Sequence, residues 1–385
     1  ATASYQCEGA WDVDEKVESM WDRYLHEENL ENGDVASDHY HRFDEDIKMM
    51  ADGSQNAYRF SLSWPRIIKN KQGDVNEKGI AFYKRILKSC QENGIEPFVT
   101  LYHWDLPQYW QSEGGWLNKE VCYAFEHYAK VCFENFGDQI KYWTTFNEPK
   151  WFVMSGYLIG NYPPGHQSYQ ETIQAAYNVM YASSLGVKAF KEGKYHGMIG
   201  IVHSFTPVNG VDDTLETKIA MRYADNYCNN WILDTAAKGE FPIDLLTELS
   251  KKFDLSFIET EELRTIKANT VDYLGLNYYS RTLVKPYTDG ETILVVNNKG
   301  KEGKGQSKVI LKGWFEQVLN DPNMTYTEWD TEIYPKGLQE GLIEVYEKYH
   351  LPIFITENGV GVRVDVLVDQ VQDDYRISFM NDHIN

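Results

Sequence analysis

The sequence of 385 residues has few cysteines, no long apolar run and no surplus of basic residues. The cysteines number five, an odd count, and none forms a Cys-x-x-Cys pair; they are Cys7, Cys90, Cys122, Cys132 and Cys228. This usage predicts reduced thiols in a cytoplasmic protein rather than a disulfide framework or a zinc site. No apolar run reaches the length of a membrane span, so we expect no membrane partner.

The charge balance excludes another class of partner. Lys and Arg number 37 against 58 Asp and Glu, which gives a formal net charge of −21. Nucleic acid is not expected as a partner, because its binding needs basic patches that displace counterions. A small phosphorylated ligand is not excluded, since exposed charges are largely screened beyond about 10 Å and a few local Lys or Arg suffice.

Aromatic residues are abundant. They make up 14% of the chain, with 11 Trp and 27 Tyr, and 42% of the residues are hydrophobic. Such a chain can bury one large core. Aromatic rings also stack on the apolar faces of sugars, and composition does not choose between the two uses. No linker or internal repeat divides the chain, so we expect one domain over residues 1–385.

Short apolar runs alternate with longer helical patterns. The helical patterns include 78–93 and 119–136, and apolar residues in the first recur on one helical face until Gly94. Alternation of this kind predicts βαβ units, and runs that are apolar throughout predict parallel strands buried on both faces, as in a barrel. The expected strands are 1–5, 56–62, 96–102, 142–146, 198–202, 273–277 and 353–356.

Polar residues follow these strands where each one ends. They are Gln6, His103, Asn147 with Glu148, His203, Asn277 with Tyr279, and Glu357. In a (β/α)8 barrel the active site gathers at the C-terminal ends of the strands, so the pattern predicts such a site. Seven strand ends can be counted and a closed barrel needs eight. Because 374–385 resembles a helix that should precede the last strand, we expect that strand to be absent from this chain.

Two glutamates are delivered by separate strands. Glu148 follows the apolar run 142–146, and Glu357 follows 351–356. Two carboxyl groups at strand ends suit cleavage of a glycosidic bond, with one acid protonating the leaving oxygen and one nucleophile below the sugar ring.

The segments around these glutamates resemble a known family. Thr145-Phe-Asn-Glu-Pro149 and Ile355-Thr-Glu-Asn-Gly359 are similar to the two signatures of glycoside hydrolase family 1. The resemblance implies a (β/α)8 TIM barrel, with Glu148 as general acid/base and Glu357 as nucleophile. It also implies retention of configuration, for which the carboxyl groups should lie about 5–5.5 Å apart.

The same resemblance assigns roles to further residues. Arg59 matches the family arginine that contacts the nucleophile. Tyr279 matches the family tyrosine that orients the nucleophile. Asn147 would bind the sugar 2-hydroxyl. Sugar-binding positions are also expected at Gln6, His103, Trp104 and Asn277, and His203 is expected to be structural or lining. No metal or cofactor is implied, and the two histidines of Asp38-His-Tyr-His41 should diverge on a helix.

Several features of the sequence bear on the substrate. Residues 232–235, 326–335 and the Gly- and Lys-rich stretch 289–313, which we expect to form a β-hairpin over the barrel mouth, are most similar to bacterial 6-phospho-β-glycosidases. Trp104 leans towards glucosides. Family members often have Trp at the position of Thr331; Trp329 either replaces that leaving-group platform or faces elsewhere.

Three readings stay open. The leading one is a 6-phospho-β-glucosidase acting on a small β-glycoside such as cellobiose 6-phosphate, in the cytoplasm, after phosphorylating uptake. The second is a β-glucosidase or β-galactosidase acting on plain sugars, and the third is a non-catalytic sugar-binding derivative. The residues that would hold a 6-phosphate are expected near the absent strand. The oligomeric state, homo-oligomers included, is left open.

Overall fold

The computed structural model of the protein describes residues 1–295, 308–361 and 373–385. Contacts divide the chain into two compact units. The first contains Ala1–His203, Asp234–Glu240 and Glu248–Gly275, and the second contains Ser204–Leu233, Phe241–Thr247 and Leu276–Asn385. Each unit is described by itself below, and the expectation of a single domain stays a prediction.

Six strands form the main sheet, in the order β1-β2-β3-β4-β6-β13. Their bounds are β1 (Ala57–Ser61), β2 (Glu96–Tyr102), β3 (Tyr142–Asn147), β4 (Met198–Phe205), β6 (Tyr273–Tyr278) and β13 (Ile353–Asn358). The pairings β1–β2, β2–β3 and β3–β4 are parallel, with Ala57 opposite Glu96, Phe98 opposite Tyr142 and Tyr142 opposite Met198. The six predicted strands after the first are therefore confirmed, with ends that differ by a few residues.

The expected strand over 1–5 is wrong. Only Thr2 pairs there, as an isolated parallel bridge to Phe60, and residues Ser4–Cys7 form the short helix α1. The backbone N–H of Thr2 donates to the carbonyl oxygen of Arg59, and that of Ser61 donates to Thr2. After Thr2 the chain turns into helix α1, in which the amide of Cys7 donates a hydrogen bond to the carbonyl oxygen of Ala3.

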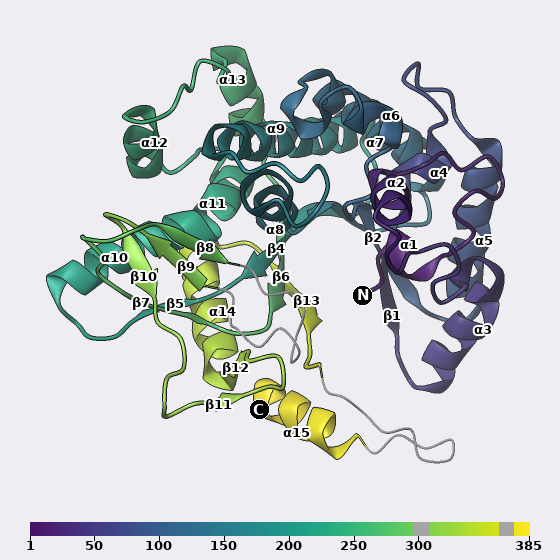
Figure 1. Ribbon diagram of the computed structural model, residues 1–385. Coiled ribbons are helices and arrows are strands. Elements are labelled where there is room, and N and C mark those ends of the chain that lie inside the picture. The colour runs from purple at the N-terminus through teal and green to yellow at the C-terminus, as the bar shows by residue number, and fades with distance from the viewer. Residues whose placement is uncertain (296–307, 362–372) are drawn as a thin grey trace. The chain divides into compact units, whose positions relative to one another are not determined.

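Helices follow the strands along the chain (Figure 1). The α-helices are α2 (Met20–Glu27), α3 (His39–Asp52), α4 (Trp64–Ile67), α5 (Glu77–Glu92), α6 (Gln108–Gln111), α7 (Glu120–Phe136), α8 (Pro149–Val153), α9 (Tyr169–Gly193), α10 (Leu215–Asp225), α11 (Trp231–Lys238), α12 (Ile243–Ser250), α13 (Thr260–Ala268), α14 (Pro335–Tyr349) and α15 (Asp374–Ile384). A 3-10 turn spans Gly115–Leu117, and π-helices span Met154–Ile159 and Asn226–Asn230.

Helix α5 shows why the predicted helices formed. Asn76 caps it by accepting a hydrogen bond from the Lys78 amide, which satisfies one of the free N–H groups of the first turn. The expected apolar face, which includes Ile80 and Tyr83, is buried. The chain leaves the helix at Gly94 with a φ of +68°, a conformation that glycine adopts without strain. The predicted helix over 119–136 is likewise present as α7, which packs along α9.

The core of the first unit is rich in aromatic rings. Trp64 and Tyr128 stack with their ring centroids 5.1 Å apart, and Phe125 and Phe146 lie 4.6 Å apart. Trp64, Tyr128, Trp116 and Trp143 rank among the largest fully buried side chains. Much of the aromatic surplus of the sequence is therefore used for packing.

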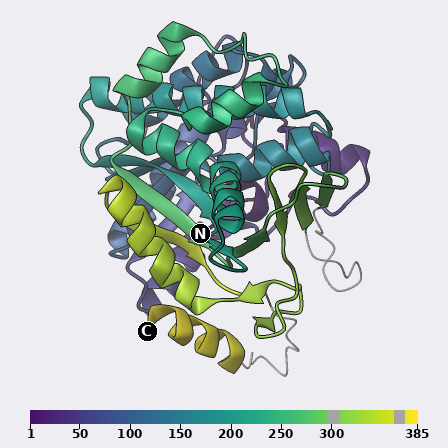
Figure 2. The ribbon, with the colours of Figure 1, turned by 90° about the vertical axis from the view of Figure 1, so that its left-hand side faces the viewer.

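The second unit carries a separate sheet in the order β5-β7-β10-β9-β8. Its strands are β5 (Val208–Gly210), β7 (Thr282–Lys285), β8 (Ile293–Val295), β9 (Lys308–Leu311) and β10 (Phe315–Gln317). The antiparallel pairing of β8 with β9 confirms the two strands of the hairpin predicted over 289–313; residues 296–307 lie outside the described residues, and the place of the hairpin over the barrel mouth stays a prediction. Helix α10 packs on this sheet through Ala220 and Ala224. The helix predicted over 374–385 is present as α15, beside α14 (Figure 2).

Candidate active site

Glu148 lies at the turn between β3 and α8. It is 9% exposed, and its amide donates a hydrogen bond of 2.8 Å to the Val202 carbonyl on β4. Its backbone φ and ψ are 47° and 60°, which is the left-handed region that glutamate rarely adopts. Such backbone conformations persist where the surrounding structure imposes them, and they cluster at active sites.

Asn147 connects two other predicted site residues. Arg59 Nη2 donates to Asn147 Oδ1 at 2.6 Å, and Asn147 Nδ2 lies 3.1 Å from His103 Nε2. Since the amide oxygen already accepts from Arg59, the amide nitrogen is the group that faces His103. His103 Nε2 is then the acceptor, so the neutral ring carries its proton on Nδ1.

The pKa of His103 lies well below its usual value. Removal of the ring from water is the main cause, and the positive charge of Arg59 is the next. Because Nε2 accepts from Asn147, the Nδ1–H of the neutral ring is the group left to donate to a sugar hydroxyl.

Trp104 has the second unusual backbone in this region, with φ at +81°. Its indole Nε1 donates to the Asn147 carbonyl at 2.8 Å, and this bond fixes the ring against the residue before Glu148. The ring centroid of Trp104 lies 5.8 Å from that of Tyr162. A bulky residue at positive φ is a genuine outlier and indicates a constrained position.

Gln6 differs from these residues in its surroundings. It is exposed, in α1, and its side chain makes no hydrogen bond within the described part of the chain. The helix itself is anchored: Ser4 Oγ donates to Asp105 Oδ2 at 2.9 Å, and the Ser4 amide donates to Ser61 Oγ at 2.8 Å. The first unit therefore brings Arg59, His103, Trp104, Asn147 and Glu148 together.

The second unit supplies Glu357, near the end of β13. Tyr279 Oη donates to Glu357 Oε2 at 2.7 Å, so the tyrosine and the carboxylate are in contact as the resemblance implies. Next to them, Thr356 Oγ1 donates to Asn277 Oδ1 at 2.7 Å, and Asn358 Nδ2 donates to the Tyr278 carbonyl at 2.9 Å. The ends of β6 and β13 are thus fastened together beside Glu357.

Trp329 lies in the segment between β11 (Thr325–Tyr326) and β12 (Glu332–Ile333) and is 47% exposed. Arg281 holds the base of this segment, because it donates to Glu332 at 2.6 Å and to Asp321 at 3.1 Å. The Arg281 guanidinium also lies 4.2 Å from the ring centroid of Tyr334. An exposed indole on a braced segment is available to a ligand.

Several residues near the site were not assigned a role from the sequence. Tyr162 and Trp21 lie with ring centroids 5.0 Å apart, and Tyr162 is also the neighbour of Trp104. Asp105 follows Trp104 directly and is 1% exposed. Its acidic side chain inside an apolar motif was a signal in the sequence, whereas nothing in the sequence pointed to Tyr162 or Trp21.

Three further histidines were considered from the sequence. His39 Nδ1 pairs with Asp46 at 2.6 Å and His41 Nδ1 pairs with Asp38 at 2.6 Å, so each ring has its own carboxylate. His203 is fully buried. Within 1–295, 308–361 and 373–385, no group of three or more His, Cys, Asp or Glu is arranged to hold a metal ion.

Comparison with known proteins defines the class. The model of glycosyl hydrolase family 1 matches residues 1–385. A 6-phospho-β-galactosidase of Clostridium acetobutylicum is 38% identical over 393 residues, with 100% of this chain and 82% of that protein covered. The aryl-phospho-β-D-glucosidase BglC of Bacillus subtilis is 36% identical over 390 residues, with 100% of this chain and 81% of that protein covered.

Solved structures agree on the fold. A family 1 β-glucosidase of Exiguobacterium antarcticum B7 is similar with a TM-score of 0.87 at 34% identity, over 99% of this chain and 82% of that one. The protein is therefore a hydrolase whose α/β fold is a TIM barrel. It belongs to glycosyl hydrolase family 1 and acts on a glycoside. In the described residues, no helix has the length and apolar character needed to cross a membrane.

Proposed function

We propose that the protein is a retaining glycosidase that hydrolyses 6-phospho-β-glycosides, with 6-phospho-β-D-glucosides as its preferred class. The observation that carries the mechanism is that each predicted catalytic glutamate stands beside a hydrogen-bonded predicted site residue. Glu148 follows an asparagine fixed by Arg59 at 2.6 Å, and Glu357 accepts a hydrogen bond from Tyr279 at 2.7 Å. Two carboxyl groups at strand ends suit this chemistry.

The proposed reaction has two steps. A carboxylate oxygen of Glu357 attacks the anomeric carbon while the bond to the leaving group breaks, and Glu148 gives its proton to the departing oxygen. Glu148 then takes a proton from water, the water oxygen attacks the same carbon, and Glu357 is released. Asn147 would bind the sugar 2-hydroxyl, a contact that strengthens in the transition state. Gln6, His103, Trp104 and Asn277 would hold the other sugar groups, and Trp329 would face the leaving group.

The names of the sequence relatives support a phosphorylated substrate. Those proteins, 36–38% identical, are named a 6-phospho-β-galactosidase and an aryl-phospho-β-D-glucosidase. We further propose a cytoplasmic location, because sugar phosphates arise inside cells and the cysteine usage fits reduced thiols.

A second candidate is a β-glucosidase that acts on plain sugars. It is favoured by the solved structures, among them the Exiguobacterium antarcticum enzyme and a family 1 β-glucosidase from Thermotoga maritima, 34% identical with a TM-score of 0.87. These proteins share the fold, so the substrate has to be decided by assay.

The deciding experiment compares p-nitrophenyl β-D-glucoside with its 6-phosphate and with the galactoside 6-phosphate. We expect turnover of the phosphates, with the glucoside phosphate preferred, and loss of activity in Glu357→Gln. Glu347→Gln, an exposed glutamate on α14, is the matched control and should keep full activity. Turnover of the plain glucoside alone would make the second candidate correct.

A further inference from the structure

Four aromatic rings that lie far apart in the sequence form a continuous row in the first unit. Tyr5 stacks on Trp21 with the ring centroids 6.1 Å apart, and Trp21 lies 5.0 Å from Tyr162. Tyr162 in turn lies 5.8 Å from Trp104. None of these four side chains is buried in the core, because each keeps part of its surface exposed. We call this row the aromatic wall.

One end of the aromatic wall borders the proposed acid. The Trp104 indole donates to the carbonyl of Asn147, the residue directly before Glu148. Burial raises the pKa of Tyr162, and the negative charge of Glu148 acts in the same direction, so the tyrosine lies within electrostatic reach of that carboxyl. A general acid has to reach the oxygen of the leaving group. The wall therefore borders the space into which the leaving group departs.

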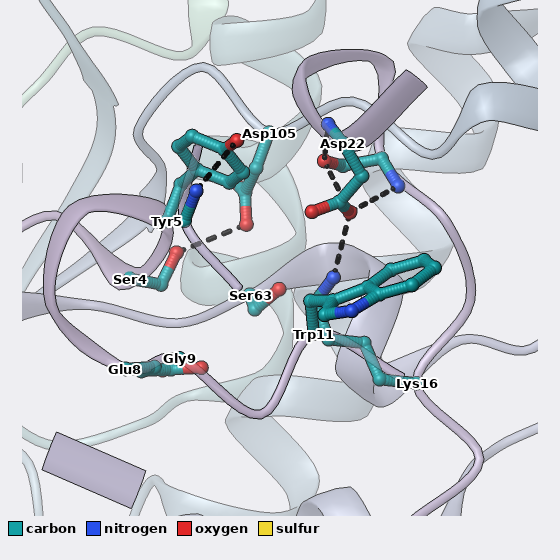
Figure 3. A pocket seen from close by; sticks show the side chains of 11 residues that line it. Ser4, Tyr5, Glu8, Gly9, Trp11, Lys16, Asp22, Ser63 and Asp105 are labelled. Atoms are coloured by element: carbon teal, nitrogen blue, oxygen red, sulfur yellow. Dashed lines mark hydrogen bonds and ion pairs between the residues drawn. The ribbon is translucent and has the colours of Figure 1, made fainter. Parts of the chain in front are cut away.

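The rings of the wall are held in place before any ligand binds. Tyr5 Oη accepts from the Gly33 amide at 3.2 Å, and Trp151 of α8 donates a hydrogen bond to the Tyr162 hydroxyl. Tyr5 also lines the small polar pocket shown in Figure 3, which has room for about one water molecule and not for a sugar or an aromatic ring. Fixed rings lose little conformational freedom on binding, so they suit a binding surface.

The wall offers a ligand carbon surface. Its polar atoms already have partners within the protein at Trp104, Tyr5 and Tyr162. The hydroxyl groups of a second sugar need hydrogen-bond partners when they leave water. A flat aromatic ring needs none, and it gains from stacked and edge-to-face contacts with other rings.

We propose that Tyr162 and Trp21 are specificity-determining residues that bind the leaving group of the substrate, and that the leaving group they favour is an aromatic ring, as in aryl β-glycosides. The planes of Trp21 and Tyr162 meet at 73°, so the two rings form a corner in which a third ring can meet one face and one edge. This inference deepens the proposed function and rests on its assignment of Glu148 as the acid.

The test is the dissociation constant, measured by calorimetry, of three β-thioglucosides that carry a phenyl, a methyl or a glucosyl group on sulfur. Thioglycosides suit the measurement because sulfur accepts the proton of an acid poorly, so they are hydrolysed slowly. Each compound is compared as the plain glucoside and as its 6-phosphate. We expect the phenyl compound to bind at least about 10-fold more tightly than the methyl compound, and more tightly than the glucosyl compound.

Variants of the wall test which residues produce this preference. Tyr162→Ala and Trp21→Leu should each lower the phenyl-to-methyl ratio of affinities by at least about 3-fold. Tyr162→Phe keeps the ring and should keep the ratio. Tyr375→Ala is the matched control, because Tyr375 is 44% exposed on α15, and it should also keep the ratio.

Equal binding of the phenyl and methyl compounds, or an unchanged ratio in both Tyr162→Ala and Trp21→Leu, would overturn the proposal. Tighter binding of the glucosyl compound would overturn it in favour of a second sugar. If one of the two variants does not fold, the other decides. A preference for plain over phosphorylated glucose would contradict the phosphate specificity of the proposed function, whereas the ratio within either series still tests the aromatic wall.

Discussion

Two residues next to Asn147 have positive backbone φ values. Glu148, which follows it in the chain, has a φ of 47°, and Trp104, which donates to its carbonyl, has a φ of 81°. Each of these costs of order 1–3 kcal/mol, and the hydrogen bonds around Asn147 offset part of it. The Trp104 indole bonds the Asn147 carbonyl, and Arg59 bonds its side chain. The strain is therefore concentrated around the residue that precedes the proposed acid.

Replacement of Glu148 by Gln removes the proposed proton donor without changing its size. For a disaccharide 6-phosphate, whose leaving group needs a proton, we expect kcat/KM to fall by about 10²–10⁴-fold. For a dinitrophenyl glycoside phosphate, which leaves without protonation, the first step should be nearly unaffected. Steady-state kinetics against a series of leaving groups measures this. An equal loss for all leaving groups would contradict the role of Glu148 as acid.

Replacement of Tyr279 by Phe removes the hydroxyl that donates to Glu357 at 2.7 Å. A hydrogen bond to a charged group contributes about 1.5–3 kcal/mol, so kcat/KM should fall by about 10- to 150-fold. Because the bond orients the nucleophile, we expect the loss mainly in kcat. Tyr346→Phe, an exposed tyrosine on α14, should have no effect. A change confined to KM would indicate that Tyr279 only contacts the sugar.

Helix α4 is joined to α1 and α5 by one buried charge network. Arg66 of α4 pairs with Glu8 at 3.0 Å, and Tyr83 of α5 donates to the other oxygen of Glu8 at 2.6 Å. Arg66 also stacks on Tyr40 at 4.5 Å. The network therefore holds Glu8, the residue that follows α1, while the Ser4–Asp105 bond holds the start of this helix.

Arg66→Met should destabilise the protein strongly, because it leaves the Glu8 carboxylate buried without its cation. Breaking a buried pair in this way costs about 3–5 kcal/mol of unfolding free energy. The double variant Glu8→Gln with Arg66→Met removes both charges and should recover part of the loss. Chemical denaturation of the three proteins measures this. The argument would be contradicted if the double variant lost more unfolding free energy than the two single variants lose together.

The strands were predictable from the sequence because their apolar runs are continuous, as in β3 and β6. The segment 1–5 was not, because Ala3 and Tyr5 resemble strand residues although only Thr2 pairs with β1. The hydrogen-bond partners of the side chains were harder to predict from the sequence. The Arg59–Asn147 bond joins residues 88 positions apart, and the positive φ of Trp104 has no sequence signal comparable to a glycine. Motif resemblance supplied the identities of these residues, while only the structure supplied the Asn147 hydrogen bonds.

At the scale of the whole molecule, stability is expected to depend on pH through Asp105. Its pKa is about 7 in the folded protein, against an ordinary value of 3.8, because the side chain is buried. The folded state therefore binds more protons than the unfolded state between these values. The contribution to stability is fully present below about pH 4 and is lost as the pH rises through about 7.

The measurement is the unfolding free energy of the wild type and of Asp105→Asn in choline buffers, from about pH 5 to about pH 8. Other carboxyl groups titrate in both proteins, so the difference between the two curves isolates Asp105. We expect the wild type to lose stability relative to the variant over this interval by an amount on the order of 2–3 kcal/mol, because only about two of the pH units between the unfolded and folded pKa values lie within it. Parallel curves for the two proteins would contradict a raised pKa of Asp105 in the folded state, and with it the pH dependence argued from its burial.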